Sequence, residues 1–214
     1  MSPTRIAGTV AAIVVPPVWN NWILPRLRLG IRGRTAANAG FAVGYAFVLR
    51  GKPNWGAPRG VRCGLVSASM VAAGYAALLA VPWGRRRLGE YADRGPGVSA
   101  VEWVVVHIPV GTVYSEELVF RATLDPVLDN AFGARFGALV GAVTFGLWHI
   151  APARVAGDNV PATVAATSVG GFVFGWLCRR TDSAVAPALL HLAVDVGGGV
   201  AVRVARRLAS SRRD

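Results

Sequence analysis

Several ionisable side chains in the second half of the chain stand inside long apolar stretches. A charged group at the centre of a membrane helix costs about 2.5–3.5 kcal/mol on insertion scales, so such residues rarely persist without a task. The chain has three histidines, and all of them are in this group: His107, His149 and His191. The others are carboxylates and one arginine: Glu102, Glu116, Glu117, Arg121 and Asp195. Carboxylates and imidazoles together can activate water, move protons or bind a metal ion.

Two of these stretches are predicted to meet as an antiparallel hairpin. Glu117 and Arg121 are four residues apart and can form an ion pair, which leaves Glu116 as the unpaired carboxylate. Glu116 and His149 reach the same depth if the chain reverses within residues 130–133. That segment reads Asn-Ala-Phe-Gly, and Asn and Gly favour a turn. The sequence therefore predicts that Glu116 and His149 lie close together in the membrane.

Spacing also predicts what stands beside each imidazole. His191 and Asp195 are four residues apart, which places the ring and the carboxylate on one helix face. Phe145 precedes His149 by one turn and can pack beneath its ring. His149, His191 with Asp195, and the paired carboxylates thus form a candidate site on three helices.

The elements that must position these residues are predicted to be membrane helices. Hydrophobic residues make up 53% of the 214 residues, charged residues only 16%, and the mean hydropathy is +0.45. Backbone groups in lipid must pair within their own segment, so long apolar blocks are helices and not strands. The sequence predicts an all-α, polytopic bundle of about seven transmembrane helices, over residues 5–25, 35–49, 61–83, 98–120, 133–153, 161–178 and 184–202. Asp125-Pro126 is expected to restart a helix after the fourth block.

The net charge of +12 is interpreted as membrane topology. No nucleic-acid recognition motif accompanies the charge, so the bilayer is the expected partner and nucleic acid is not. The loops expected on the same side of the membrane as the C-terminus carry more Lys and Arg than the loops expected on the opposite side. This distribution predicts a plasma-membrane protein with a cytoplasmic C-terminus. Arginine in place of lysine, with abundant Ala and Gly, indicates a GC-rich bacterial genome. The basic residues flank the apolar blocks in clusters: Arg26/Arg28/Arg32/Arg34, Arg85–Arg87 and Arg203/Arg206/Arg207/Arg212/Arg213.

Three motifs in this order resemble the CAAX-protease and bacteriocin-processing (CPBP) family of intramembrane proteases, which includes the type II CAAX prenyl endopeptidases. They are Glu116-Glu117-Leu-Val-Phe-Arg121, Phe145-Gly-Leu-Trp-His149 and His191-Leu-Ala-Val-Asp195. The resemblance covers about residues 98–200. It implies an intramembrane endopeptidase that hydrolyses a peptide bond in a membrane-associated protein or peptide. It also implies catalytic roles for Glu116, Glu117, His149, His191 and Asp195, with Arg121 and Phe145 in support.

With this resemblance the chain divides into three parts. Residues 1–97 are expected to be N-terminal transmembrane helices, 98–202 the CPBP-like catalytic core and 203–214 a basic tail. Glu102 and His107 match no family motif and are expected to be structural. The eukaryotic CAAX proteases have Asn where this chain has Asp195, and an ionised Asp cannot donate a hydrogen bond to an oxyanion.

Two mechanisms fit these residues. In the first, Glu116 with His149 takes a proton from water, while His191 and Asp195 stabilise the tetrahedral intermediate. In the second, His149, His191 and Glu116 hold Zn²⁺, which leaves one position for water. No HExxH motif occurs, which excludes a zincin-like site. Two other function classes stay open: a proton-coupled transporter and a non-catalytic membrane scaffold that uses the same polar cluster.

Overall fold

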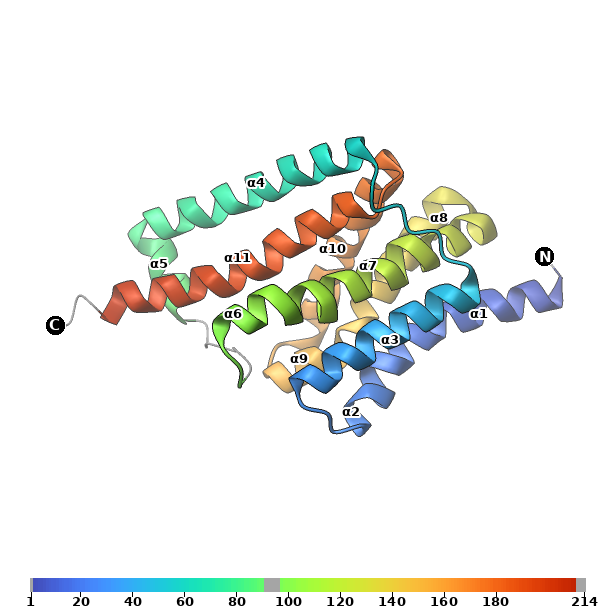
Figure 1. The fold of residues 1–214 in the computed structure, drawn as a ribbon, viewed down its shortest axis with the longest axis horizontal. Helices are drawn as coiled ribbons and strands as arrows, with labels where there is room; N and C mark the ends of the chain where they lie inside the picture. Colours follow the sequence, from blue (N-terminus) through green and yellow to red (C-terminus); the bar gives the residue numbers. More distant parts are fainter. Residues whose placement is uncertain (1, 91–96, 211–214) are drawn as a thin grey trace.

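The computed structural model describes residues 2–90 and 97–210, and every regular element within them is helical (Figure 1). The predicted all-α bundle is confirmed. Arg212 and Arg213 of the predicted tail lie outside the described residues. The elements are α1 (Pro3–Val18), the π-helical η1 (Trp19–Ile23), α2 (Leu24–Arg26), α3 (Ile31–Leu49), α4 (Pro58–Ala80), α5 (Pro82–Glu90), α6 (Ala100–Glu102), the π-helical η2 (Trp103–Tyr114), α7 (Ser115–Val119), the π-helical η3 (Phe120–Leu124), α8 (Asp125–Trp148), α9 (Ile150–Ala156), α10 (Val160–Thr181) and α11 (Val185–Ser210).

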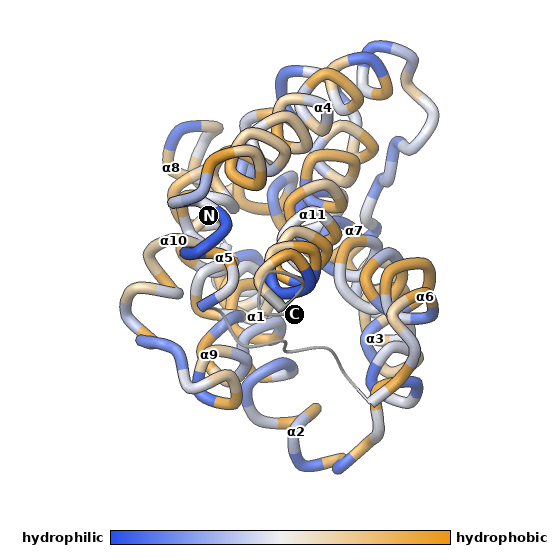
Figure 2. The backbone as a smooth tube through the Cα atoms, turned by 90° about the vertical axis from the view of Figure 1, so that its left-hand side faces the viewer, coloured by the Kyte–Doolittle hydropathy of each residue, from blue (hydrophilic) through white to orange (hydrophobic). Residues whose placement is uncertain are grey.

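Five helical stretches of the described chain are long and apolar enough to cross a membrane. One of them, Ala100–Ala156, includes two of the predicted spans. The predicted span 35–49 lies within α3, which is not among the five, because Arg32, Arg34 and polar residues make this helix less apolar. Seen from the end of the bundle (Figure 2), apolar residues predominate along α4 and α11, and hydrophilic residues are frequent in the turns. The chain is an integral membrane protein.

The predicted reversal near residue 133 is present. Gly133 has φ 77° and ψ 158°, which breaks α8 into a short first part and a long second part. This backbone conformation favours glycine, since a Cβ would be strained there. Glu116 and His149 are therefore brought together on the two arms of a hairpin, as the spacing predicts.

The prediction that Asp125-Pro126 restarts a helix is wrong. η3 runs directly into α8, and Leu124 and Asp125 both have helical backbone angles. Pro126 has no N–H to offer to the carbonyl of Ala122, one turn earlier. The backbone N–H of Lys52 donates to that carbonyl instead, at 2.9 Å. A loop from elsewhere in the chain thus keeps the helix continuous across the proline.

Two boundaries also differ from the sequence prediction. The helix predicted over 133–153 breaks at His149, where α8 ends and α9 begins. The segment that follows residue 83, which lies between two predicted spans, forms the short helix α5. At the C-terminus, α11 continues through Ser210, so Arg203 and Arg206 lie on a helix.

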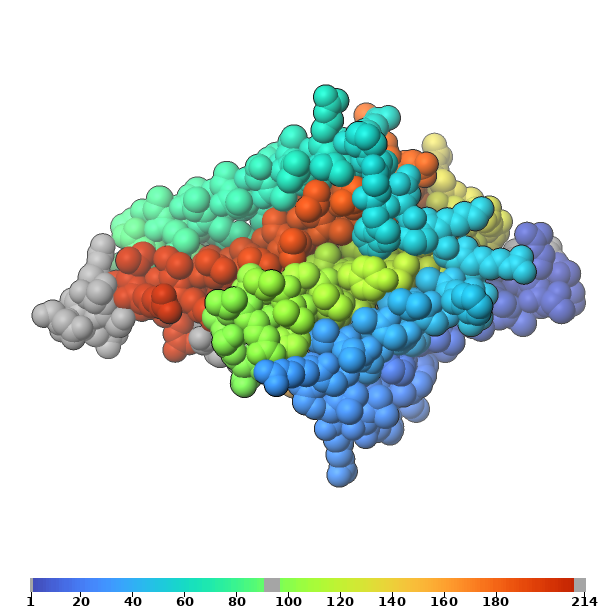
Figure 3. All heavy atoms as spheres, in the orientation of Figure 1, coloured from blue at the N-terminus to red at the C-terminus, as the bar shows by residue number. Residues whose placement is uncertain are grey.

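The long helices lie side by side along the length of the molecule (Figure 1). In the space-filling view (Figure 3), α4, α11, the α6–α7 helix and α3 cover one face. α11 packs against α4 and α10, α10 packs against α8, and α8 packs against α1. The largest cluster of buried hydrophobic residues lies between α1, α3, α7, η3, α8 and α10, so the core surrounds the carboxylates of α7.

Candidate active site

Glu116 and Glu117 lie side by side on α7, in the buried centre of the bundle. Glu116 is 6% exposed and Glu117 is fully buried. Glu116 Oε1 accepts a hydrogen bond from Trp148 Nε1 at 3.0 Å, while its Oε2 is buried with no hydrogen-bond partner. Glu117 instead lies 3.5 Å from Arg121 and so has the predicted ion pair. Glu117 Oε2 also lacks a hydrogen-bond partner but lies beside the Arg121 guanidinium, whereas Glu116 Oε2 faces two imidazoles.

His149 presents an unprotonated nitrogen to Glu116. Its Nδ1 donates to the backbone carbonyl of Phe145 at 2.8 Å, because a carbonyl can only accept. In the neutral ring, Nε2 therefore carries the lone pair, and it stands 3.9 Å from Glu116 Oε2. The ring packs on Phe145 with 4.8 Å between centroids, as predicted.

His191 stands on the other side of the same carboxylate oxygen. Its Nδ1 donates to Glu117 Oε1 at 2.8 Å. Its Nε2 lies 3.9 Å from Glu116 Oε2 and 3.6 Å from Asp195 Oδ2, so Asp195 shares the face that its spacing predicts. Both gaps to Glu116 are too long for a direct hydrogen bond. A water at about 2.8 Å from Glu116 and from either imidazole can bridge such a gap.

A chain of buried charges holds Glu117 in place from behind. Arg121 lies between Glu117 and Asp125, and Asp125 is also 3.6 Å from Arg179 on α10. Arg179 in turn makes two hydrogen bonds of 2.8 Å to Asp129. Each charge has an opposite neighbour, which is what burial of ions requires. Arg121, predicted as a supporting residue, pairs with both carboxylates, although its Nε and Nη2 have no hydrogen-bond partner.

Aromatic rings enclose the histidines. Phe174 of α10 stacks on His191 with 4.7 Å between centroids, and Phe145 meets the same ring edge-on. Phe120 packs edge-on against Phe145 and Trp148. These contacts fix the ring orientations.

A cavity of about 550 Å³ reaches the site. Glu116, His149 and Asp195 line it. Glu117 and His191 are not among its lining residues, but His191 Nε2 lies next to two of them, Glu116 and Asp195. The volume is within the range of small-molecule and peptide pockets. Toward the end of the bundle where α11 ends (Figure 1), the cavity is lined by residues at the starts of α3 and η2 and in α9: Ile31, Arg34, Thr35, Trp103 and Pro152.

Glu102 and His107 lie farther along this cavity wall. Glu102 pairs with Arg32 at 2.7 Å and with His107 at 3.1 Å. The hydrogen bonds that Arg32 donates to this carboxylate raise the pKa of its guanidinium, which lies outside the candidate spans. His107 Nδ1 is also 2.8 Å from the Thr35 hydroxyl. The network joins η2 to α3, which fits the expected structural role, and His107 also lines the cavity.

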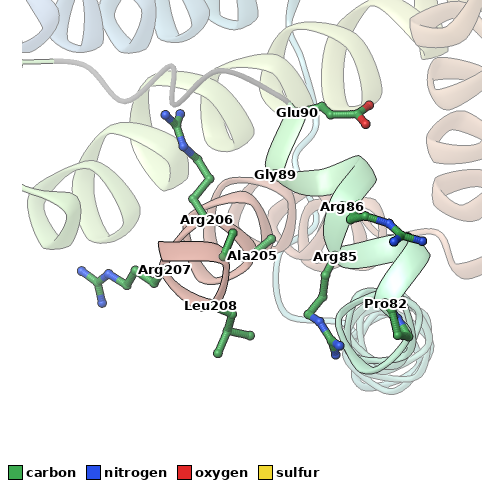
Figure 4. A pocket seen from close by; sticks show the side chains of 10 residues that line it. Pro82, Arg85, Arg86, Gly89, Glu90, Ala205, Arg206, Arg207 and Leu208 are labelled. Atoms are coloured by element: carbon green, nitrogen blue, oxygen red, sulfur yellow. The ribbon is translucent and has the colours of Figure 1, made fainter. Parts of the chain in front are cut away.

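A larger cavity of about 940 Å³ lies away from this chemistry, between α5 and the end of α11 (Figure 4). Its lining includes Arg85, Arg86, Arg206 and Arg207, with Glu90 as the one carboxylate among its described residues. No histidine is among those lining residues. Size alone therefore does not identify the site; the arrangement around Glu116 does.

The zinc hypothesis can be compared with this geometry. Ligands bound at about 2.0–2.2 Å around a tetrahedral zinc stand about 3.4 Å from one another. Glu116 Oε2 is 3.9 Å from both His149 Nε2 and His191 Nε2. Within the described parts of the chain, no group of three or more His, Cys, Asp or Glu side chains is placed to hold a metal ion. As placed, the three residues do not fit zinc, and a zinc site stays a prediction.

Sequence reasoning missed the neutral residues around the carboxylate. Trp148 is the direct donor to Glu116, and Asn20 of η1 lines the same cavity. Asn38 of α3 also lines it and accepts from Trp19 Nε1 at 3.0 Å. The available signal was the presence of asparagines within predicted membrane helices, where polar side chains hydrogen-bond across helices.

Comparison with known proteins gives one finding for this chain. Residues 98–197, just under half of its length, match the family model "Type II CAAX prenyl endopeptidase Rce1-like". No curated protein and no solved structure matches. The matched segment contains the three motifs and both arms of the hairpin. Residues 98–197 are thus similar to the Rce1-like family of type II CAAX prenyl endopeptidases, in agreement with the CPBP resemblance of the three motifs.

Proposed function

We propose that the protein is an intramembrane endopeptidase in which Glu116 activates water to cleave a membrane-associated protein or peptide. The family supports a CAAX-type protease activity. The observation that carries the proposal is Glu116 Oε2. This atom is buried, lacks a hydrogen-bond partner and stands 3.9 Å from Nε2 of both His149 and His191, on a cavity wall. A buried acceptor of this kind requires a polar occupant, and water is the simplest one.

The proposed reaction follows from the protonation of these groups. A water donates one hydrogen to Glu116 Oε2 and the other to His149 Nε2, so its lone pair faces the cavity. The water oxygen attacks the peptide carbonyl carbon as Glu116 takes the first proton. His191, when its ring carries both protons, donates from Nε2 to the oxyanion. Glu116 then returns the proton to the leaving amine as the C–N bond breaks.

Glu117 and Asp195 serve His191 in this scheme. Glu117 accepts from Nδ1 and so fixes the ring orientation. Asp195 lies 3.6 Å from Nε2 and orients the same ring from the cavity side. Neither carboxylate contacts the oxyanion in this scheme.

The test compares protein termini in cells that express the wild type or Glu116→Ala at matched levels. We expect a set of new termini that disappears in Glu116→Ala and in His149→Ala. Those termini also identify the substrate. An unchanged set, with both variants present and folded, would refute the proposal.

Metal removal tests the zinc alternative. We expect cleavage by purified protein to survive dialysis against a chelator, because the described residues do not fit zinc. Loss of activity that Zn²⁺ restores, with metal bound in proportion to protein, would instead establish the zinc mechanism. Retention of metal by His149→Ala would argue against a site at these residues.

A proton pathway is the second candidate, and one observation favours it. Beyond Glu116, the charges of Glu117, Arg121, Asp125 and Arg179 continue toward the other end of the bundle. Chains of ionisable residues within the membrane are typical of proton relays. Proton flux into vesicles that Glu116→Gln abolishes, without any cleavage activity, would support this function.

A further inference from the structure

The backbone around His149 is broken in a way that leaves polar groups without helical partners. α8 ends at Trp148, His149 has φ −89° and ψ 5°, and α9 then begins. In a continuous helix the carbonyl of Trp148 would accept from residue 152, but Pro152 has no N–H. The carbonyl of Leu147 would accept from Ala151. The backbone groups at this break therefore need hydrogen-bond partners from outside α8 and α9.

Two asparagines of the N-terminal helix supply those partners. Asn20 Nδ2 donates to the carbonyl of Trp148 at 2.7 Å, in the place of the missing N–H of Pro152. Asn21 Nδ2 donates to the carbonyl of Leu147 at 2.8 Å. Asn21 Oδ1 accepts from the backbone N–H of Ala151 at 2.7 Å. One amide group is thus inserted between a donor and an acceptor that would bond directly in an unbroken helix.

The segment that carries both asparagines is itself unusual. Trp19–Ile23 is π-helical and follows Pro16 and Pro17, which remove two backbone donors from α1. Asn20 is 4% exposed and lines the reaction cavity. A buried amide in an apolar helix needs hydrogen bonds, and the side chains of Asn20 and Asn21 make theirs with residues 147–151.

We propose that Asn20 and Asn21 are positioning residues that hold the α8–α9 break and thereby place Trp148 and His149 on the two oxygens of Glu116. The Trp148 indole meets Oε1 and His149 Nε2 faces Oε2. The side chains of Trp148 and His149 start from the backbone segment 147–151, whose carbonyl and amide groups bond to Asn20 and Asn21. The inference rests on the proposed function for its kinetic effect, and it places part of the site outside the family segment 98–197.

Removal of the amide of Asn21 lets Ala151 bond directly to the carbonyl of Leu147. The break then rewinds toward a continuous helix, and the His149 ring turns away from Glu116. Removal of the amide of Asn20 leaves the carbonyl of Trp148 without a donor in a buried place. Both changes act through His149 and Trp148, so they lower kcat more than they raise KM.

The experiment uses the full-length protein in lipid nanodiscs. Asn20→Leu and Asn21→Leu preserve the approximate side-chain size and remove the hydrogen bonds. Asn54→Leu is the matched control, because Asn54 Nδ2 also donates to a distant backbone carbonyl, that of Asp182, at 2.8 Å. Imidazole ¹⁵N resonances of His149 and the kinetics of cleavage are measured for each variant.

We expect kcat to fall at least tenfold in Asn20→Leu and Asn21→Leu, with KM within threefold of the wild type and with shifted His149 resonances. Asn54→Leu should match the wild type in both measurements. Unchanged His149 resonances and kcat in the double variant would overturn the proposal. If Leu at 21 prevents folding, Asn21→Asp retains the acceptor for Ala151 and should give an intermediate shift; no shift there would also overturn it. If the wild type cleaves nothing, the proposed function fails, and the His149 resonances still decide the positioning role.

Discussion

At the scale of single residues, the two adjacent glutamates occupy different electrostatic environments. Glu117 lies beside the Arg121 guanidinium and accepts from His191, whereas Glu116 accepts from a neutral donor, Trp148. One oxygen of each carboxylate has no hydrogen-bond partner, and that of Glu116 faces the imidazoles of His149 and His191. A buried ion pair is destabilised when one partner is removed, because the other charge is left alone. Glu116 is not paired with Arg121, so its neutralisation leaves no arginine charge without a partner. Glu117 is therefore expected to contribute to the stability of the fold, and Glu116 to the reaction.

Substitution of each glutamate by glutamine should have different effects on kcat and on the free energy of unfolding. We expect Glu116→Gln to lower kcat by about 10²–10⁴-fold and to leave the free energy of unfolding unchanged or higher. Glu117→Gln should reduce the free energy of unfolding by about 3–5 kcal/mol, because Arg121 loses one of its two buried carboxylate partners. Cleavage kinetics and unfolding in the same detergent provide both numbers. Equal destabilisation by the two variants would contradict this assignment.

Trp148 offers a second test at this scale. Trp148→Phe removes the donor to Glu116 Oε1 and preserves an aromatic ring against Phe120. We expect kcat to fall about 10- to 100-fold, the equivalent of one hydrogen bond to a charged group. Trp176→Phe on the exposed side of α10 is the control and should have the kinetics of the wild type. A similar loss in both variants would show a general effect of tryptophan removal.

At the scale of elements, close packing of α10 against α8 sets the depth of the site. Gly171 of α10 faces Phe145, the residue whose ring lies beneath His149. A Cβ at Gly171 would stand 2.9 Å from Phe145 Cβ, closer than real contacts allow. The adjacent Gly170 faces open space, and a Cβ added there would have no atom within 4 Å. Small residues thus matter on one face of this helix only.

Alanine at each of these glycines is a matched pair. We expect Gly171→Ala to lower the free energy of unfolding by about 1–3 kcal/mol and to impair cleavage, because Phe145 must move. Gly170→Ala should stabilise the helix by about 0.5–1 kcal/mol and leave cleavage unchanged. Thermal unfolding and kcat measured on both variants check the pair. The same response at both positions would mean that the contact with Phe145 has no special weight.

At the scale of the whole molecule, the reaction cavity and the C-terminus of α11 share one end of the bundle. Trp103 lines the cavity, and the guanidinium of Arg203 on α11 lies 4.8 Å from its ring centroid. The distribution of basic residues predicts that this end is cytoplasmic. The proposed substrate would then reach Glu116 from the cytoplasmic side of the plasma membrane.

Thiol labelling in intact cells tests this orientation. In a chain with Cys63 and Cys178 replaced by serine, Lys52→Cys should react with a membrane-impermeant reagent added outside. Arg34→Cys, at the cavity end, should react only after the cells are permeabilised. Both positions are exposed, so accessibility across the protein surface does not limit labelling. The reverse pattern would place the cavity on the outer side.

Features that depend on neighbours along the chain could be predicted from the amino-acid sequence. The all-α fold follows from long apolar blocks, the pairs Glu117–Arg121 and His191–Asp195 follow from helical spacing, and the hairpin follows from the turn at Gly133. Each is set by local backbone geometry, which a pattern of residue types can encode.

The residues that complete the site from distant parts of the chain could be identified only from the way the helices pack in the tertiary structure. Trp148 belongs to one of the three motifs, but its indole has a role only because α8 folds back on α7. Pro152 marks a local weakness of the helix, but the groups that hold the break at His149 could not be predicted, because Asn20 and Asn21 lie more than a hundred residues away in the sequence. Asp125 resembles a helix cap in sequence and is instead a buried partner of Arg179. Such contacts depend on how helices pack, and helical periodicity carries no information about the partner.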